Sequence, residues 1–257
     1  EYYRSLTVGR ILLEGLQAAL QHKDRPHSQP HAAPLISSLD NLGLLDSLDM
    51  TQRLDKDEYQ EQLATEQARL AGLMRDKRFR KHALIAVFEG NDAAGKGGAI
   101  RRVAAALDPR QYRIVPIAAP TEEELAQPYL WRFWRHIPAR GKFTVFDRSW
   151  YGRVLVERVE GYCSPADWLR AYSEINDFEE QLTRAGVVLV KFWLSIDQAT
   201  QLQRFEEREQ IPFKRFKITE DDWRNRDKWQ QYSDAVGDMV DRTSSEIAAW
   251  TLVEAND

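Results

Sequence analysis

Residues 84–98 join a buried-strand pattern to a glycine-rich turn, and this stretch constrains the fold more than any other part of the sequence. It reads Leu-Ile-Ala-Val-Phe-Glu-Gly-Asn-Asp-Ala-Ala-Gly-Lys-Gly-Gly, an apolar run followed directly by Gly-x-x-x-x-Gly-Lys. A strand that ends in such a turn and continues into a helix directs backbone N–H groups and a helix N-terminus toward one point, where phosphate oxygens bind. The stretch therefore predicts a phosphate-binding loop.

Two glycines and a lysine give this loop its expected chemistry. Gly90 and Gly95 let the backbone turn without Cβ clashes, and Lys96 is placed to reach between phosphoryl groups. Gly97 follows at the position where the usual motif has Ser or Thr to hold magnesium. Asp92 is a hard oxygen donor that could instead bind the metal or orient an acceptor phosphate. The other candidate phosphate-binding residues of the loop are Asn91, Ala93, Ala94 and Gly98.

From residue 83 onward, strand patterns alternate with helix patterns. The expected strands are 83–89, 113–118, 142–147, 187–196 and 250–253. Near-continuous apolar runs separated by helical segments are typical of a parallel sheet that is covered on both faces. We therefore predict an α/β fold with three layers and a central parallel five-stranded sheet, and ligands collect at the carboxyl ends of the strands in such sheets.

One of these ends carries a second candidate site, where an apolar strand leads into Asp147 and Arg148. An aspartate in this position is similar to the second nucleotide-binding motif of phosphate-loop enzymes, in which it orients magnesium. The alternative is that Asp147 only caps the next helix. Paired with the loop, the pattern favours Asp92 and Asp147 as magnesium ligands.

Helical patterns flank this core. Residues 8–20 and 57–74 have the apolar spacing of helices that pack one face, whereas residues 21–34 have three prolines and no periodicity, as in a linker. Residues 204–228 are rich in Lys and Arg and are interrupted at 211–217, which is typical of a lid; an exposed charged helix is the alternative.

Charge and composition exclude several classes of protein. The 257 residues have a net charge of −4, which argues against a general nucleic-acid binder. The single cysteine, Cys163, cannot form an internal disulfide, and no stretch is apolar enough to span a membrane. We therefore expect a cytoplasmic protein without nucleic-acid or membrane partners.

A local basic cluster precedes the first strand. It is either a solvated helix end or a contact surface for a polyanion, and its members are Arg75, Lys77, Arg78, Arg80 and Lys81.

Together these motifs resemble the type 2 polyphosphate kinase family, whose members move phosphoryl groups between inorganic polyphosphate and nucleotides. The resemblance rests on 88–98 with Arg102 beyond, on Phe-Asp-Arg-Ser-Trp-Tyr-Gly-Arg at 146–153, and on 212–217 leading to 223–229. It covers about residues 42–257, and a glycine at position 97 is what this family has. It implies a phosphate-loop kinase fold like that of thymidylate kinase, with a helical lid.

Residues 1–20 and Gly152 are most similar to the AMP-phosphorylating subgroup, which has two fused domains. This resemblance implies that 1–20 is the tail of a preceding kinase-like unit, 21–41 a linker, and 42–257 a kinase domain truncated at its C-terminal end. The implied reaction is magnesium-dependent transfer of the terminal phosphoryl group of polyphosphate to AMP, giving ADP, by a homo-oligomer. The alternatives are an ADP or GDP kinase of the same family, an ATP-dependent nucleoside monophosphate kinase, and a non-catalytic nucleotide or polyphosphate sensor.

The resemblance also implies roles for individual side chains. Arg148 and Arg208 would neutralise charge that develops between donor and acceptor. Arg102 would bind phosphate, and Lys214 and Lys217 would contact the polyphosphate. The predicted catalytic residues are Asp92, Lys96, Asp147, Arg148 and Arg208.

Overall fold

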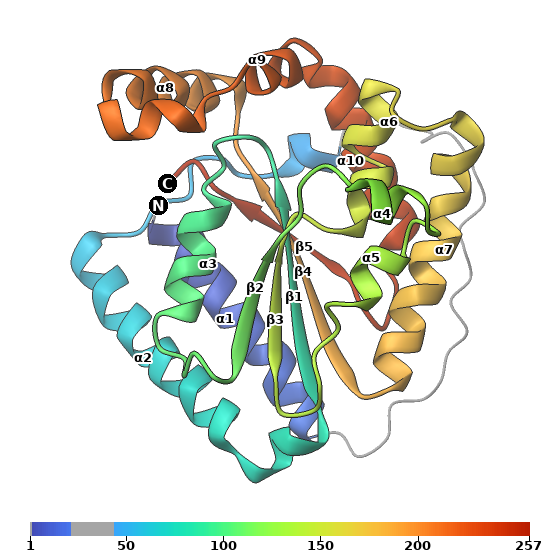
Figure 1. The fold of residues 1–257 in the computed structure, drawn as a ribbon. Coiled ribbons are helices and arrows are strands. Elements are labelled where there is room, and N and C mark those ends of the chain that lie inside the picture. The colour runs from blue at the N-terminus through green and yellow to red at the C-terminus, as the bar shows by residue number, and fades with distance from the viewer. Residues whose placement is uncertain (1, 22–43) are drawn as a thin grey trace.

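Five parallel strands form a single sheet at the centre of the computed structural model, which describes residues 2–21 and 44–257 (Figure 1). The strands are β1 (Ala83–Gly90), β2 (Tyr112–Pro116), β3 (Phe143–Asp147), β4 (Val187–Ser195) and β5 (Trp250–Glu254), in the order β2-β3-β1-β4-β5. The predicted fold class and all five predicted strands are confirmed. The linker expected over 21–41 lies outside the described residues, apart from its first residue.

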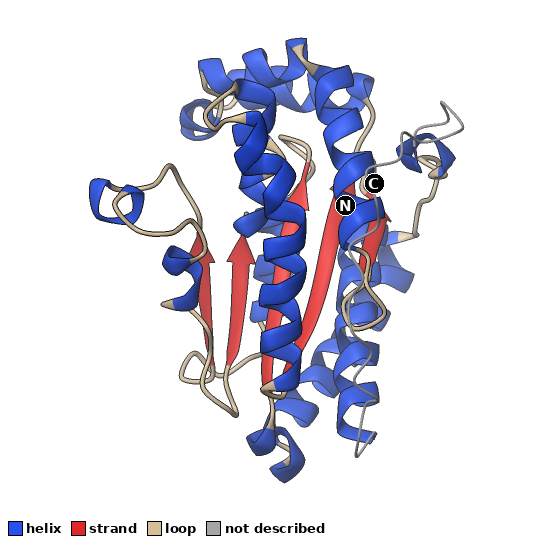
Figure 2. Cartoon of the chain, turned by 90° about the vertical axis from the view of Figure 1, so that its right-hand side faces the viewer, coloured by secondary structure: helices blue, strands red, loops and turns tan. Residues whose placement is uncertain are grey.

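Helices cover both faces of this sheet (Figures 1 and 2). One face packs against α1 (Tyr2–Gln21), α2 (Lys56–Arg75) and α3 (Lys96–Ala104), and the other packs against α7 (Pro165–Arg184) and α10 (Trp229–Thr243). The shorter helices are α4 (Glu122–Leu125), α5 (Trp131–Trp134), α6 (Val156–Glu160), α8 (Gln198–Gln210) and α9 (Glu220–Asp227). Short 3-10 helices occur at η1 (Leu44–Ser47), η2 (Lys77–Lys81), η3 (Trp150–Arg153) and η4 (Pro212–Lys217).

The two-residue alternation of β1 divides the interior into two cores. Leu84, Ala86 and Phe88 join the core under α1 and α3, while Ile85 and Val87 join the core under α7 and α10. All five side chains are fully buried. A central strand buried on both faces has a continuous apolar run, which explains why β1 was recognisable in the sequence.

Helix α1 is packed into the first of these cores. Val8, Leu12, Leu13 and Leu16 are all fully buried, and a Cβ at Gly15 would lie 3.2 Å from Cγ2 of Val190 in β4. The helix begins well before the predicted residue 8. The origin of residues 1–20 as the tail of a preceding unit stays a prediction.

The predicted break in the basic segment is confirmed. Helix α8 ends at Gln210, the η4 turn follows, and α9 begins at Glu220. These elements lie beyond the ends of the strands toward which the arrows point in Figures 1 and 2. The segment is therefore placed where a lid over the carboxyl edge of the sheet would lie, and α8, η4 and α9 are together called the lid below. Within the described residues, no helix is both long and apolar enough to cross a membrane.

We expect Leu12→Ala to lower the free energy of unfolding by about 2–5 kcal/mol, because it leaves a cavity between α1 and the sheet. Chemical denaturation followed by circular dichroism measures the change. Glu14→Ala, on the exposed side of the same helix, is the matched control and should change stability little. Equal stability of the two variants would show that α1 does not contribute to this core.

Candidate active site

The turn between β1 and α3 has a backbone that only certain residues can adopt. Gly90 has φ +151°, and a Cβ there would lie 2.4 Å from the carbonyl oxygen of Leu194 in β4. Gly95 has φ +91° and ends the turn in a left-handed conformation. Ala93, with φ +63°, is one of two non-glycine residues with positive φ in the described chain. Such strain is found where a loop is held in one shape for function.

Helix α3 begins without a side-chain cap, because its N-cap residue is Gly95. The first N–H groups of a helix have no partner within the helix, so those of Lys96 and Gly97 remain available to an anion. A Cβ at Gly97 would meet no atom within 4 Å. No steric contact therefore requires glycine there, and the place of the usual Ser or Thr side chain is open space.

Lys96 lies against its own loop in this structure. Its Nζ donates to the carbonyl oxygens of Gly90, at 2.7 Å, and of Asn91, at 3.1 Å. Burial lowers the pKa of the Lys96 ammonium, as does the positive charge of Arg148, while Asp92, Asp147 and Glu89 oppose this shift. The ammonium is therefore held by carbonyl oxygens that a phosphate oxygen can replace.

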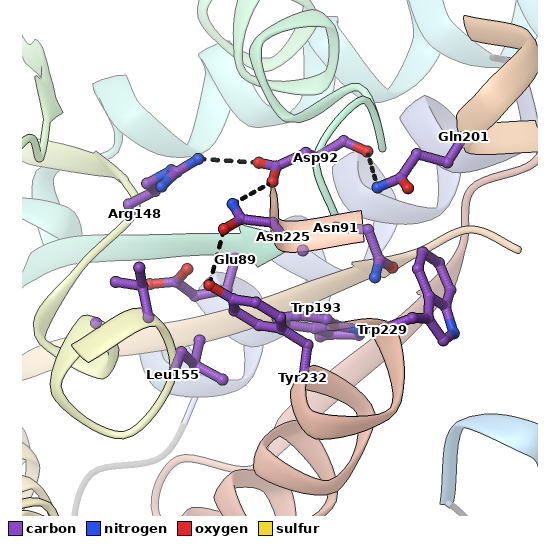
Figure 3. A pocket seen from close by; sticks show the side chains of 13 residues that line it. Glu89, Asn91, Asp92, Arg148, Leu155, Trp193, Gln201, Asn225, Trp229 and Tyr232 are labelled. Atoms are coloured by element: carbon purple, nitrogen blue, oxygen red, sulfur yellow. Dashed lines mark hydrogen bonds and ion pairs between the residues drawn. The ribbon is translucent and has the colours of Figure 1, made fainter. Parts of the chain in front are cut away.

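Asp92 is the centre of a small polar cluster (Figure 3). Its carboxylate accepts from Nη2 of Arg148, at 3.0 Å, and from Nδ2 of Asn225 in α9, at 2.8 Å. Its backbone oxygen accepts from Nε2 of Gln201 in α8, at 3.1 Å. The Asp92 side chain is only 12% exposed, and the Arg148 side chain is 47% exposed. The cluster therefore joins the phosphate loop to the end of β3 and to the lid.

The strand register explains why Arg148 meets Asp92. Phe88 of β1 pairs with Asp147 of β3, and the N–H of Arg148 donates to the carbonyl oxygen of Phe88 at 3.0 Å. Arg148 is the second non-glycine residue with positive φ, at +63°. This strained turn directs the guanidinium back over β1, toward the loop.

Several residues of the site had no assigned role in the sequence analysis. Glu89 is 5% exposed and accepts a hydrogen bond from Oγ of Ser149 at 2.8 Å. Burial raises the pKa of the Glu89 carboxyl, against the opposing effects of that hydrogen bond and of Lys96. Both residues stand inside the two motifs, beside Gly90 and Arg148. Their position within the two motifs was therefore the signal in the sequence that could have identified them as site residues.

The lid contributes a chain of polar contacts that periodicity does not reveal. Tyr232 in α10 donates to Oδ1 of Asn225, at 3.1 Å, and its hydroxyl also lies 3.3 Å from Oε1 of Glu160. Glu160, in α6, pairs at 2.8 Å with both Arg224 and Lys228. The contact between Asn225 and Asp92 is therefore supported by Tyr232 of α10 and by Glu160 of α6.

Two arginines hold the phosphate loop by donating hydrogen bonds to its carbonyl oxygens. Arg4 of α1 donates to the carbonyl oxygens of Ala94, at 2.9 Å, and Ala255, at 3.2 Å. Arg204 of α8 donates to the carbonyl oxygens of Ala93, at 3.0 Å, and Ala255, at 2.9 Å. The loop is thus tied to the end of β5 by two positive charges, Arg4 and Arg204, that are far apart in the sequence.

A buried ion pair anchors the segment that follows Arg148. Glu179 of α7 accepts from Nε1 of Trp150, at 3.0 Å, and from the hydroxyl of Tyr151 in the same segment, at 2.6 Å. Lys191 of β4 donates to the other Glu179 oxygen, at 2.7 Å, and to the carbonyl oxygen of Thr243, at 2.8 Å. Lys191 and Glu179 are 0% and 1% exposed. The pair fixes the η3 turn against the sheet.

Two pockets meet at Arg148. The smaller, of about 80 Å³, lies between the phosphate loop and the lid and includes Trp193, Trp229 and Tyr232 (Figure 3). The larger, of about 750 Å³, is lined by Tyr129, Arg153 and residues of α4 and α9. The Arg153 guanidinium lies over the Tyr129 ring, 4.1 Å from its centre. Arg148, Gly152 and Asn225 line both pockets.

The structure brings together four of the five predicted catalytic residues. Lys96, Asp92, Asp147 and Arg148 lie at the adjacent carboxyl ends of β1 and β3. Arg208 lies in the last turn of α8 and lines neither pocket. Its role stays a prediction.

Arg102, one of the three predicted phosphate contacts outside the loop, lies away from the cluster. Arg102 donates to the carbonyl oxygen of Gly98 at 3.2 Å and lines a crevice between α1, α2 and α3. Lys214 and Lys217 belong to η4, and their side chains are not among those that the structure describes. Contact of these residues with a polyphosphate chain stays a prediction.

Comparison with known proteins identifies the family. Residues 53–257 match the sequence pattern of polyphosphate kinase 2 (PPK2), and the chain therefore belongs to this family of phosphate-loop kinases. It is 80% identical over 257 residues to a polyphosphate:AMP phosphotransferase of Pseudomonas aeruginosa, covering all of this chain and 52% of that protein. It is 73% identical to the polyphosphate:AMP phosphotransferase of Pseudomonas syringae pv. tomato, covering 99% of this chain and 51% of that protein.

A crystal structure agrees with this assignment. A polyphosphate kinase 2 structure from Pseudomonas aeruginosa superposes with a TM-score of 0.83 at 76% identity, covering 98% of this chain and 51% of the other. The chain thus spans about half the length of the relatives that it matches. The predicted family is confirmed.

The buried ion pair leads to a prediction about stability. We expect Lys191→Met to lower the free energy of unfolding by about 3–5 kcal/mol, because it leaves the Glu179 carboxylate buried without its cation. The double variant Lys191→Met with Glu179→Gln should be more stable than the single one, since glutamine keeps an acceptor for Trp150 and Tyr151. Urea denaturation measures both. A double variant as unstable as the sum of the two singles would contradict the coupling.

Proposed function

We propose that this protein transfers the terminal phosphoryl group of inorganic polyphosphate to AMP, giving ADP. The observation that carries the proposal is the convergence of Lys96, Asp92, Asp147 and Arg148 at the carboxyl ends of two neighbouring strands. Phosphoryl transfer needs positioned positive charge and little covalent chemistry from the protein. The names of the two Pseudomonas relatives support polyphosphate as donor and AMP as acceptor.

The two pockets support a division of labour. The larger one, of about 750 Å³, is within the size range of small-molecule sites and has room for a nucleotide. The smaller one, beside the phosphate loop, has about 80 Å³ and suits phosphate groups without a nucleoside. We therefore assign the acceptor nucleotide to the larger pocket and the end of the polyphosphate chain to the phosphate loop.

Arg148 occupies the boundary between donor and acceptor. It lines both pockets and is half exposed, so its guanidinium can contact phosphates from either side. Lys96 and the first N–H groups of α3 would hold the transferring group once a phosphate oxygen replaces the loop carbonyls around Nζ. Charge that develops on the transferring oxygens would then be met by fixed positive groups, which is the main catalytic contribution in this class of reaction.

The donor set at this site fits magnesium. Mg²⁺ is usually held by one or two carboxylates together with substrate phosphates and waters. Asp92 and Asp147 supply two carboxylates, and within the described residues no group of three or more His, Cys, Asp or Glu side chains forms a complete metal site. Asp92 and Asp147 would therefore hold the ion jointly with the substrate, and the ion would neutralise phosphate charge.

A product assay tests the proposal. The protein is incubated with magnesium and either polyphosphate or ATP as donor, and with AMP, ADP, GMP or GDP as acceptor. We expect ADP as the main product from polyphosphate and AMP, because one extra acceptor phosphate would displace the terminal phosphate from Arg148. A preference for ADP or GDP as acceptor would indicate a nucleoside diphosphate kinase of the same family. Activity with ATP alone would indicate a conventional monophosphate kinase, and binding without turnover would indicate a sensor.

Lys96→Ala should lower kcat by about 10²–10³, because it removes a main electrostatic stabiliser of the transferring phosphoryl group. The initial rate of ADP formation from polyphosphate and AMP measures this. Lys56→Ala, an exposed lysine at the start of α2, is the control for removal of one positive charge. A Lys96 variant within a few-fold of the Lys56 variant would exclude the assigned role.

A further inference from the structure

An exposed basic surface lies at the end of the sheet opposite the candidate active site. It is formed by Arg75 at the end of α2, by residues of η2 directly before β1, and by the turn before β3. We call it the basal surface. Its members are Arg75, Lys77, Arg80, Lys81, Arg140 and Lys142, all of them exposed.

Backbone contacts hold these separate segments together. The N–H of Gly141 donates to the carbonyl oxygen of His82 at 2.6 Å, and the N–H of Leu84 donates to that of Lys142 at 3.0 Å. A Cβ on Gly141 would lie 3.7 Å from Cα of Arg80. The positive charges of 75–81 and of 140–142 therefore gather at one site although they are about 60 positions apart in the sequence.

Most charges of the basal surface have no acidic neighbour in the described chain; the exception is Lys142, which donates to the carbonyl oxygen of Arg110 at 2.7 Å and helps Arg110 to lower the pKa of the Asp108 carboxyl. Among the described residues, none of its six members forms an ion pair, whereas the adjacent Arg78 and Arg110 pair with Asp76 and Asp108 at 2.7 Å. The complete chain has 36 Lys and Arg against 40 Asp and Glu, so this local excess runs against the overall charge. The negative end of the α2 dipole accounts for Arg75 alone, because the other members lie beyond that helix.

We propose that the basal surface binds a distal part of a long polyphosphate chain whose end lies at the phosphate loop. This proposal rests on the proposed function, since the donor is then itself a polyanion that extends away from the site. Several unpaired cations on one surface attract such a chain strongly, and the attraction falls with salt. Binding at two places on one molecule raises affinity without any change at the reacting group.

The geometry sets a length requirement. The basal surface and the phosphate loop lie at opposite ends of β1, whose eight residues span about 26 Å at 3.3 Å per residue. Figure 1 shows the lower end of α2 and the turn before β3 at the edge of the sheet opposite α8 and α9. A short oligophosphate bound at the loop cannot reach the basal surface, whereas a long chain can.

The test compares long-chain polyphosphate with a short oligophosphate as donor to AMP. The variant Lys77→Gln, Arg80→Gln, Lys81→Gln and Arg140→Gln removes four basal charges. The matched control, Arg10→Gln, Lys56→Gln, Arg69→Gln and Arg170→Gln, removes four exposed charges from α1, α2 and α7. We expect the basal variant to raise the KM for the long donor about tenfold or more, with kcat and the KM for the short donor unchanged.

Raised salt should remove this difference, because it screens the basal contact in the parent protein. Equal changes of KM for the two donors, no change for either, or the same change in the matched control would overturn the proposal. The single variant Arg80→Glu provides the same comparison with one substitution. A parent protein that makes no ADP from either donor would instead contradict the proposed function, so the two failures are distinguishable.

Discussion

The position of β3 beside β1 in the sheet is the constraint on which the candidate site depends. Because Phe88 and Asp147 are paired in a parallel register, the phosphate loop and the Asp147-Arg148 turn leave the sheet at the same edge. The 3.0 Å contact between Arg148 and Asp92 follows from this arrangement and from the positive φ of Arg148. A shift of register by one residue would turn Asp147 to the other face and separate the two motifs.

The rest of the molecule holds these two turns in place. Arg4 and Arg204 tie the phosphate loop to the end of β5, and the Lys191–Glu179 pair ties the η3 turn to α7. The lid adds Asn225, which reaches Asp92 from the other side. Preorganisation of this kind is what phosphoryl transfer requires, because the positive groups must already be placed when charge develops on the phosphate.

The local motifs made much of the site predictable. Gly90 and Gly95 were recognisable because the turn needs their conformations, and Lys96, Asp92, Asp147 and Arg148 stand at fixed offsets from two apolar strands. Arg4, Glu179, Lys191 and Asn225 were not predicted. Each acts through a partner far away in the sequence, and no local pattern distinguishes such a side chain from an ordinary surface charge or core neighbour.

By itself, therefore, the sequence determined the strands, the phosphate loop and the chemistry of its side chains, since these follow from hydrophobic periodicity and from the conformational freedom of glycine. The tertiary structure decided which charges meet. Burial of Lys191 and Glu179, the contact of Asn225 with Asp92, and the gathering of Arg80 and Arg140 into one surface all depend on which segments the sheet order brings together. Electrostatic interaction depends on distance in space and on burial, and neither quantity is contained in sequence spacing.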